Sequence, residues 1–479
     1  MIRLETNLPE FFNELCEVVR LFYGIVDIRP DEGETLIRHV HSEENGEWIE
    51  RFSSDGASVE HRAPIVRGGL EEKRQRKRLI KRCCYMLFKR LSGRQPAWGS
   101  LTGIRPTRLY YQQLENGKTR GEARQTLQDL FDLSQEKIDL LDEILDAQQG
   151  LMDRRARACD VYIGIPFCTT RCAYCSFSSG EIGDGRLVEP YLAALLHEIE
   201  ACAEMAREMG LHIRVGYIGG GTPSSLTTPQ LDRLLAHVEK HFGALAEFTV
   251  EAGRPDTLDA QKLRMIHDHP VTRISINPQT MNDATLTRIG RAHTAKQTVE
   301  AYELARSIGF DDINMDVIAA LPGEDYAMFA HTLAEIRRLR PESLTVHTLA
   351  IKRSSRLHEE KYAQAEQDVA RMVALGRQTA HDMGMRAYYL YRQKYMAENL
   401  ENVGYALPGR FCRYNIDNME ETTSILALGA GGISKCVMRE EEKILRAPNI
   451  ANIEQYIGRV DEMIERKRVV FAEKAKKLD

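Results

Sequence analysis

Three cysteines stand together in one short segment, and their spacing is the clearest chemical signal in the chain. Cys168, Cys172 and Cys175 follow a C-x3-C-x2-C pattern, with Tyr174 directly before the third cysteine. Three thiolates on one loop can ligate three irons of a [4Fe-4S] cluster. The fourth iron then has no protein ligand and is open to a second molecule. The pattern therefore predicts a redox cluster at which chemistry takes place.

Two other interpretations of the pattern are a zinc site and a set of buried structural thiols. Structural zinc usually takes a second cysteine pair or nearby histidines, and no second C-x2-C pair is present. Scattered lone cysteines are more often small buried side chains than ligands. The remaining cysteines fit that description: Cys16, Cys83, Cys84, Cys159, Cys202, Cys412 and Cys436.

The whole chain has the composition of an ordinary globular protein with several domains. It has 479 residues, 43% of them hydrophobic and 28% charged, and a net charge of −5. That charge creates no general attraction for nucleic acid or anionic membranes. The N-terminal segment is acidic rather than basic and apolar, so it does not predict a signal peptide. No apolar run is long enough to predict a membrane span. Because an oxygen-sensitive cluster needs a reducing compartment, we expect a cytoplasmic protein.

Residues 1–155 are expected to form an α+β N-terminal accessory module. An amphipathic helix is predicted at Pro9–Val19, and a basic helix at Gly69–Leu91. Asn45-Gly46 predicts a tight hairpin turn. Short strands are predicted on the alternation of apolar residues at Tyr23–Asp27, Leu36–Val40 and Glu47–Phe52.

From Asp160 the pattern changes to short apolar strands that alternate with longer helices. Such alternation favours parallel strands joined by helical crossovers. Residues 156–350 are therefore predicted to form a partial (β/α)6 barrel, and residues 351–479 a mixed α/β C-terminal domain on the substrate side. The predicted strands are Val161–Ile165, Ile213–Ile218, Phe248–Glu251, Arg273–Ile276, Asp312–Ile318 and Ser343–His347. The predicted helices are Pro190–Met209, Pro229–Phe242, Leu258–His267, Thr294–Ile308 and Tyr326–Leu339.

Polar and glycine residues recur where these strands end. In parallel β/α folds, the loops that follow the strands share one rim, and chemistry gathers there. The cysteine loop follows the first strand. The other residues at this rim, in strand order, are Gly220, Gly221 and Thr222, then Glu251, Gln279, Asp316 and His347. Each also has an ordinary interpretation, as a tight turn, a solvated acid or a core histidine, but their shared position favours a site.

With these motifs in place, residues 160–350 resemble the radical S-adenosylmethionine (radical SAM) domain of oxygen-independent coproporphyrinogen III oxidases. The N-terminal module contains the segment Trp98-Gly99-Ser100-Leu101-Thr102-Gly103. It looks most like the N-terminal module of the Z-type, oxidase-like enzymes of haem synthesis. The matching segments are Tyr162 with Ile165-Pro166-Phe167-Cys168, the cysteine triplet, Gly219-Gly220-Gly221-Thr222-Pro223, Ile274-Ser275-Ile276 with Gln279-Thr280, Ile289-Gly290-Arg291 with His293, Ile313-Asn314-Met315-Asp316, and Cys412-Arg413-Tyr414-Asn415.

The resemblance implies two cofactors, a [4Fe-4S] cluster and S-adenosylmethionine, and a role for each matching residue. Cys168, Cys172 and Cys175 would ligate the cluster. The candidate catalytic residues are Tyr162, beside the cluster, and Asp316. The implied contacts to S-adenosylmethionine are Gly220, Gly221, Thr222, Glu251, Gln279, Arg291 and Asp316.

The implied reaction is the oxidative decarboxylation of coproporphyrinogen III propionates to vinyl groups, which gives protoporphyrinogen IX. Cleavage of S-adenosylmethionine to a 5′-deoxyadenosyl radical would start it. The chain departs from the usual oxidase at Phe177, where a fourth cysteine is usual, and at Gly164, where a histidine is usual. Lys352-Arg353 replaces the usual acidic turn, and these cations are either a carboxylate site or a surface pair.

Two other functions remain open at this stage. One is a haem-binding chaperone, for which candidate axial ligands are His293, His347, Cys412 and Tyr414. The other is a radical SAM enzyme that acts on haem or on RNA, although nucleic acid is disfavoured because no aromatic residues are interleaved with the charges of Lys73–Arg82. The expected partners are a porphyrinogen or haem-like small molecule and a reductant protein such as flavodoxin or ferredoxin.

Overall fold

The computed structural model describes residues 1–24, 26–103, 105–352, 354–360 and 368–478. The contacts divide the chain into two compact units. Unit 1 comprises Met1–Asp142 and Arg392–Glu401, and unit 2 comprises Glu143–Tyr391 and Asn402–Asp479. The division predicted from sequence, 1–155, 156–350 and 351–479, stays a prediction. No helix in the described part of the chain is long and apolar enough to cross a membrane.

Unit 1 contains a five-stranded sheet in the order β2-β1-β3-β4-β5. Its strands are β1 (Ile2–Thr6), β2 (Ile28–Arg29), β3 (Thr35–Glu44), β4 (Glu47–Ser54) and β5 (Ala57–Pro64). Its helices are α1 (Phe12–Tyr23), α2 (Gly69–Ser92), α3 (Pro106–Glu115), α4 (Arg120–Phe131) and the start of α5 (Gln135–Ala147). Asn45 and Gly46 both adopt positive φ, at 51° and 81°, which confirms the hairpin turn.

The predicted strand at Tyr23–Asp27 is wrong. Tyr23 ends α1, whose buried face of Leu15, Val18, Val19 and Phe22 repeats at helical spacing. Gly24, at φ 69°, caps that helix, and strand pairing in the described residues nearby begins at the two-residue strand β2. Ile25 lies outside the described residues.

The returning segment Arg392–Glu401 is held in unit 1 by buried polar contacts. The Glu401 carboxylate accepts hydrogen bonds from Trp98 Nε1 at 2.6 Å and from Lys137 Nζ at 2.7 Å. Arg392 donates to the carbonyl of Leu101 at 2.6 Å. The segment around Trp98 therefore has a structural partner about 300 residues away in the sequence.

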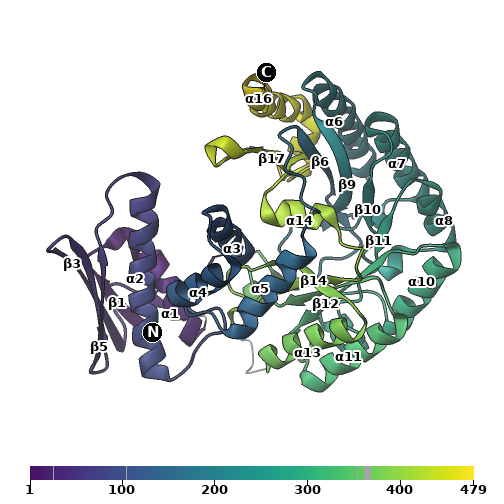
Figure 1. The fold of residues 1–479 in the computed structure, drawn as a ribbon. Helices are drawn as coiled ribbons and strands as arrows, with labels where there is room; N and C mark the ends of the chain where they lie inside the picture. Colours follow the sequence, from purple (N-terminus) through teal and green to yellow (C-terminus); the bar gives the residue numbers. More distant parts are fainter. Residues whose placement is uncertain (25, 104, 353, 361–367, 479) are drawn as a thin grey trace. The chain divides into compact units, whose positions relative to one another are not determined.

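Unit 2 is built on six parallel strands, as the sequence predicted. They lie in the order β13-β12-β11-β10-β9-β6, and a helix follows each of the first five along the chain. Figure 1 shows the helices α6, α7, α8, α10 and α11 on the outer side of these strands. The strands are β6 (Ala158–Ile165), β9 (His212–Gly220), β10 (Glu247–Glu251), β11 (Arg273–Ser275), β12 (Ile313–Ala319) and β13 (Ser343–Thr348). The α/β fold with a partial (β/α)6 arrangement is thereby confirmed.

Five helices of unit 2, α6, α7, α8, α10 and α11, agree with their predicted ranges to within about two residues. The helices of this unit are α6 (Val188–Glu208), α7 (Thr228–Phe242), α8 (Ala260–Asp268), α9 (Asp283–Arg288), α10 (Ala295–Ile308), α11 (Tyr326–Leu339), α12 (Arg356–Glu359), α13 (Val369–Asp382), α14 (Arg413–Glu420), α15 (Ile453–Gly458) and α16 (Val460–Leu478). Capping explains the sharp starts. Thr227 caps α7 and Thr294 caps α10, each in a capping box with a glutamine three residues on.

The C-terminal strands extend both edges of the parallel sheet. β15 (Asn402–Ala406) pairs antiparallel with β13 and carries β14 (Arg386–Tyr391) beyond it. At the other edge, β16 (Ser424–Leu428) pairs parallel with β6 and is followed by β17 (Ile433–Met438) and β18 (Lys443–Pro448). The result is one sheet of eleven strands in the described chain.

A buried carboxylate joins the C-terminal helices to this sheet. Glu198 on α6 accepts hydrogen bonds from the Gly429 N–H at 2.7 Å, Tyr456 Oη at 2.6 Å and Asn449 Nδ2 at 2.8 Å. Lys467 Nζ on α16 lies 2.6 Å from its Oε1, and both side chains are 0% exposed. Because every partner is buried, the ion pair is costly to break.

We therefore expect Lys467→Met to destabilise unit 2 by about 3–5 kcal/mol, since it leaves the Glu198 charge buried without its cation. The urea unfolding midpoint, followed anaerobically, measures the loss. Arg459→Met at the exposed Arg459–Glu462 pair is the matched control, with an expected change below about 1 kcal/mol. Equal midpoints for the two variants would contradict the expectation.

Candidate active site

The cysteine loop begins where strand β6 ends. Phe167 and Cys168 form the short strand β7, which pairs with β8 (Gly180–Glu181). The Ile182 N–H donates to the Cys168 carbonyl at 2.8 Å, and the Ala173 N–H donates to the Ile289 carbonyl at 2.9 Å. All three cysteines of the loop are half-buried. Backbone hydrogen bonds from several directions therefore hold the loop in place.

The glycine turn at the end of β9 is bonded directly to this loop. The Gly221 N–H donates to the Ile165 carbonyl and the Thr222 N–H donates to the Phe167 carbonyl, each at 2.7 Å. Gly220 has φ +110°, and a Cβ there would lie 2.9 Å from the Ile165 oxygen. Glycine is required by both the backbone angle and the space.

The surroundings of Cys168 leave little room for other side chains. Thr222 Oγ1 donates to Cys168 Sγ at 3.5 Å, and a Cβ on Gly221 would lie 2.9 Å from the same sulfur. Burial raises the pKa values of the Cys168 and Cys175 thiols, and each is raised further by the nearby Cys172. Three clustered thiols of this kind become thiolates when a cation, such as a metal, offsets their charge.

Glu251 ends strand β10 and faces the glycine turn. Tyr217 Oη donates to Glu251 Oε1 at 2.5 Å. Burial raises the pKa of Glu251 from its ordinary value of 4.5 to about 7, and the nearby negative charge of Asp316 adds to this rise. The carboxylate therefore lies in a site where a positively charged ligand group would be stabilised.

Asp316 of β12 and Gln279, in the loop after β11, meet at the same rim. Asn314 Nδ2 donates to Asp316 Oδ1 at 2.8 Å, and His347 Nε2 lies 3.8 Å from Oδ2. Burial opposes ionisation, yet His347 and Asn314 hold the pKa of Asp316 below its ordinary 3.8. The Gln279 N–H donates to the Asp316 carbonyl at 2.9 Å, and Gln279 has a positive φ of 65°. Asp316 is thus a stable anion beside Glu251.

Arg291, which follows helix α9, lies against the cysteine loop at Cys172 and Tyr174. Its Nη1 donates to the Asn277 carbonyl at 2.5 Å. Burial disfavours its charge, but the neighbouring Tyr174 and Cys172 raise the pKa of the guanidinium above its ordinary value. The buried cation is therefore placed to stabilise negative charge on the loop thiols.

Three tyrosine rings stack on one another beside Glu251. Tyr217 stacks on Tyr414 with ring centroids 4.6 Å apart, and Tyr162 lies 6.3 Å from Tyr217 and 6.0 Å from Tyr414. Tyr162 and Tyr217 belong to β6 and β9, and Tyr414 comes from α14. The C-terminal part of the chain therefore contributes one wall of the aromatic cluster.

Two contacts of the site were missed by sequence reasoning. Tyr217 bonds Glu251, and Arg254 donates to both the carbonyl and the hydroxyl of Thr170 on the cysteine loop, at 3.0 and 2.8 Å. Tyr217 stands two residues before Gly219 on a strand, so period-2 alternation places both on one face. Nothing in the sequence marks Arg254, whose partner is 84 residues away.

Comparison with known proteins now identifies the family. The family model for the radical SAM superfamily matches residues 162–336. The oxygen-independent coproporphyrinogen-III oxidase-like protein HemZ of Bacillus subtilis (strain 168) is 41% identical over 380 residues, which is 77% of this chain and 76% of that protein. The chain belongs to the radical SAM superfamily and to this oxidase-like family.

Other relatives of this radical SAM protein differ in their stated roles. The heme chaperone HemW of Bacillus subtilis (strain 168) is 37% identical, over 40% of this chain and 50% of the chaperone. The solved structure of coproporphyrinogen III oxidase HemN from Escherichia coli has a TM-score of 0.53 at 23% identity, covering 67% of this chain and 72% of that one. That likeness shows the shared fold.

Radical SAM proteins use a [4Fe-4S] cluster and S-adenosylmethionine, and the residues present fit both groups. Three thiols share one loop, a threonine hydroxyl and a buried arginine adjoin them, and Gly221 leaves the approach to Cys168 free. The other predicted residues lie at this rim or contact residues of it. They are Tyr162, Gly220, Thr222, Glu251, Gln279 and Asp316. Their individual roles stay predictions.

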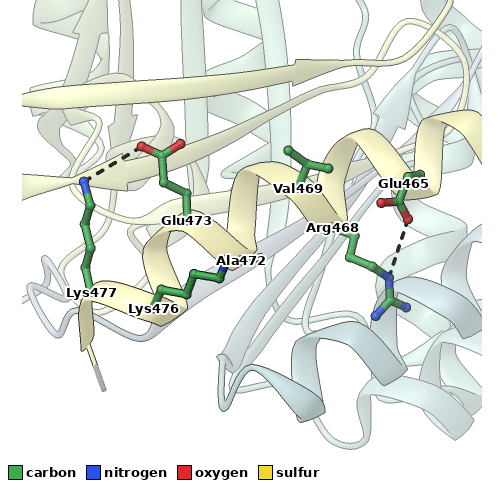
Figure 2. Close-up of a pocket in the computed structure, with 7 residues that line it drawn as sticks. All are labelled: Glu465, Arg468, Val469, Ala472, Glu473, Lys476 and Lys477. Carbon is green, nitrogen blue, oxygen red and sulfur yellow. Dashed lines mark ion pairs between the residues drawn. The ribbon is translucent and has the colours of Figure 1, made fainter.

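A separate surface hollow of about 470 Å³ lies on one face of α16. Figure 2 shows it lined by charged side chains, with ion pairs between Glu465 and Arg468 and between Glu473 and Lys477. Val469, 62% exposed, is its largest apolar side chain. None of its lining residues belongs to the cysteine loop or the rim, so it forms no part of the candidate site.

Gly221→Ala is expected to cost the radical SAM protein most of its cluster. The new Cβ would lie 2.6 Å from the Phe167 oxygen and 2.9 Å from Cys168 Sγ, so the loop must move. Iron and sulfide per chain after anaerobic reconstitution measure the effect, with an expected loss of at least about tenfold in metal affinity. Gly180→Ala, in the paired strand β8 with nothing within 4 Å of its Cβ, is the control. A full iron content in G221A would refute the role of this clearance.

The raised pKa of Glu251 predicts a pH-dependent stability. Folding raises this pKa from 4.5 to about 7, so the folded chain holds a proton that the unfolded chain releases. Between about pH 4.5 and pH 7 the contribution of Glu251 to stability therefore falls as pH rises. Urea midpoints of the wild type and Glu251→Gln, measured without S-adenosylmethionine across this range, should converge at low pH and separate at high pH. A constant difference would contradict this.

Proposed function

We propose that this protein oxidatively decarboxylates propionate side chains of coproporphyrinogen III to vinyl groups, which gives protoporphyrinogen IX. The observation that carries the proposal is the 41% identity, over about three quarters of both chains, to a protein named as oxygen-independent coproporphyrinogen-III oxidase-like. The candidate site supports it with the residues that such chemistry requires.

In this proposal the cluster is held by Cys168, Cys172 and Cys175. When both are bound, the reduced cluster and S-adenosylmethionine would supply a radical that removes hydrogen from the substrate. Carbon dioxide would then leave and an electron would pass to an acceptor. Gly220, Gly221 and Thr222 present backbone and hydroxyl groups to the methionyl part of S-adenosylmethionine. Glu251 and Asp316 attract its positive charge, and Gln279, Arg291 and Tyr162 complete the site.

The substrate's carboxylates need cations near the cluster, and Lys352 is a candidate. Burial lowers the pKa of its ammonium group, while the nearby Cys175 opposes that shift. The segment that contains it touches the cysteine loop, because the Leu357 N–H donates to the Ala173 carbonyl at 3.1 Å and Arg171 donates to the Ser354 carbonyl at 2.6 Å. Arg353, the other predicted cation, lies outside the described residues.

A second candidate function is haem binding and delivery, favoured by the identity to the heme chaperone HemW. Among the four predicted axial ligands, the side chain of His293 is 0% exposed, while that of His347 is 24% exposed. Cys412 and Tyr414 are also buried. A haem iron would therefore reach His347 with the least rearrangement.

Action on RNA has less support from the structure. The basic helix α2 uses Lys77 and Lys81 in ion pairs with Glu14 and Glu17 of α1, at 2.8 and 2.9 Å. Those charges are already neutralised within unit 1. The reductant that supplies the electron is proposed to be a flavodoxin or ferredoxin.

Anaerobic turnover tests the proposal. Reconstituted protein supplied with S-adenosylmethionine, reductant and coproporphyrinogen III is expected to release 5′-deoxyadenosine and a vinyl product that is 46 mass units lighter per converted propionate, about the mass of carbon dioxide plus two hydrogens. Mass analysis of the porphyrin product and chromatography of the nucleoside measure both. Cys172→Ser should abolish both products, whereas Cys202→Ala, at a buried thiol of α6, should retain them.

Two outcomes would overturn the decarboxylation. One is cleavage of S-adenosylmethionine with no vinyl product. The other is stoichiometric haem binding with no substrate-dependent 5′-deoxyadenosine, which would favour the chaperone function. Loss of haem binding in His347→Ala would then identify the axial ligand.

A further inference from the structure

Three metal-ligating side chains gather on the outer helical layer of unit 2. His237 and His241 are four residues apart on α7, so they lie on the same face of the helix. Glu200 comes from α6, which packs against α7 and lies beside it in Figure 1. One ligand atom from each of the three residues lies within 4.8 Å of the other two.

Each of the two histidines has a ring nitrogen that could bind a metal ion. His237 Nε2 lies 2.9 Å from the Leu196 carbonyl of α6, so Nε2 carries the proton and Nδ1 keeps a lone pair. Ligating histidines commonly fix their second nitrogen on a backbone carbonyl in this way. His241 Nε2 is buried and makes no hydrogen bond to the described residues. A buried nitrogen without a partner is unfavourable, and a metal ion would satisfy it.

We propose that Glu200, His237 and His241 bind a zinc ion, with water as the fourth ligand. Two imidazoles and one carboxylate suit zinc, whereas calcium and magnesium prefer sites made only of oxygen atoms. Tetrahedral zinc needs its ligand atoms about 3.3 Å apart. Glu200 is exposed, so its side chain is free to close the remaining distance.

The proposed ion would bridge α6 and α7, which are the helices that follow the cysteine loop and the glycine turn along the chain. A metal that bridges them holds together the two β-α units that carry those loops. The site uses imidazole and carboxylate ligands in place of thiols, and the proposal does not depend on the proposed decarboxylation.

Zinc binding to the cluster-loaded protein tests this site, because the loop cysteines are then occupied by iron. Anaerobic incubation with zinc chloride, desalting, and measurement of zinc and iron per chain should give one zinc beside a full iron content. Glu200→Gln and His241→Gln should each weaken zinc binding at least about tenfold, with iron unchanged. His269→Gln is the matched control, since His269 pairs with Asp232 and Glu239 of α7 at 3.0 and 3.4 Å.

Thermal unfolding supplies a second readout. Zinc that binds only the folded state raises the melting temperature, so the wild type and H269Q should gain stability with zinc and E200Q should not. Zinc retention in E200Q and H241Q equal to that of the wild type would overturn the proposal. If H241Q does not fold, the exposed Glu200 position decides, because its substitution removes a ligand without disturbing the core.

Discussion

The candidate site depends on one junction, where the end of strand β9 is bonded to the loop that leaves strand β6. Two backbone hydrogen bonds of 2.7 Å, from Gly221 to Ile165 and from Thr222 to Phe167, join the glycine turn to the cysteine loop. These hydrogen bonds can form only because Gly220 and Gly221 have no side chains that would collide with the backbone of the cysteine loop. The same contact that positions the thiols would also place the glycine backbone at the proposed site for S-adenosylmethionine.

Around that junction, the pKa values of two neighbouring carboxyl groups are shifted in opposite directions. Glu251 is pushed toward its neutral form by burial and by Asp316, whereas His347 and Asn314 keep Asp316 ionised. Two carboxyls whose environments separate their pKa values are typical of sites that bind or move charge. Arg291 provides the opposite sign on the far side, against Cys172. The rim is thus polarised before any cofactor arrives.

Much of this could be predicted from the sequence. The six parallel strands follow from short apolar runs between helices, and the rim residues follow from the rule that loops after parallel strands share one edge. The C-terminal strands could not be placed, because β16 reads Ser-Ile-Leu-Ala-Leu and is buried on both faces, so no alternation shows which strand it joins. Arg254 was missed because its contact with Thr170 joins distant segments. Tyr23–Asp27 was misassigned because its short apolar run begins with Tyr23, which is the last residue of helix α1.

The pairing of β16 with β6 has a consequence for the order of assembly. Strand β6 leads directly into the cysteine loop, yet its neighbour on one side is made more than 250 residues later, from Ser424 onward. During synthesis that edge of β6 stays unpaired until Ser424–Leu428 has been made. A chain that stopped before Ser424 would therefore expose an unpaired edge of the strand that leads into the three thiols.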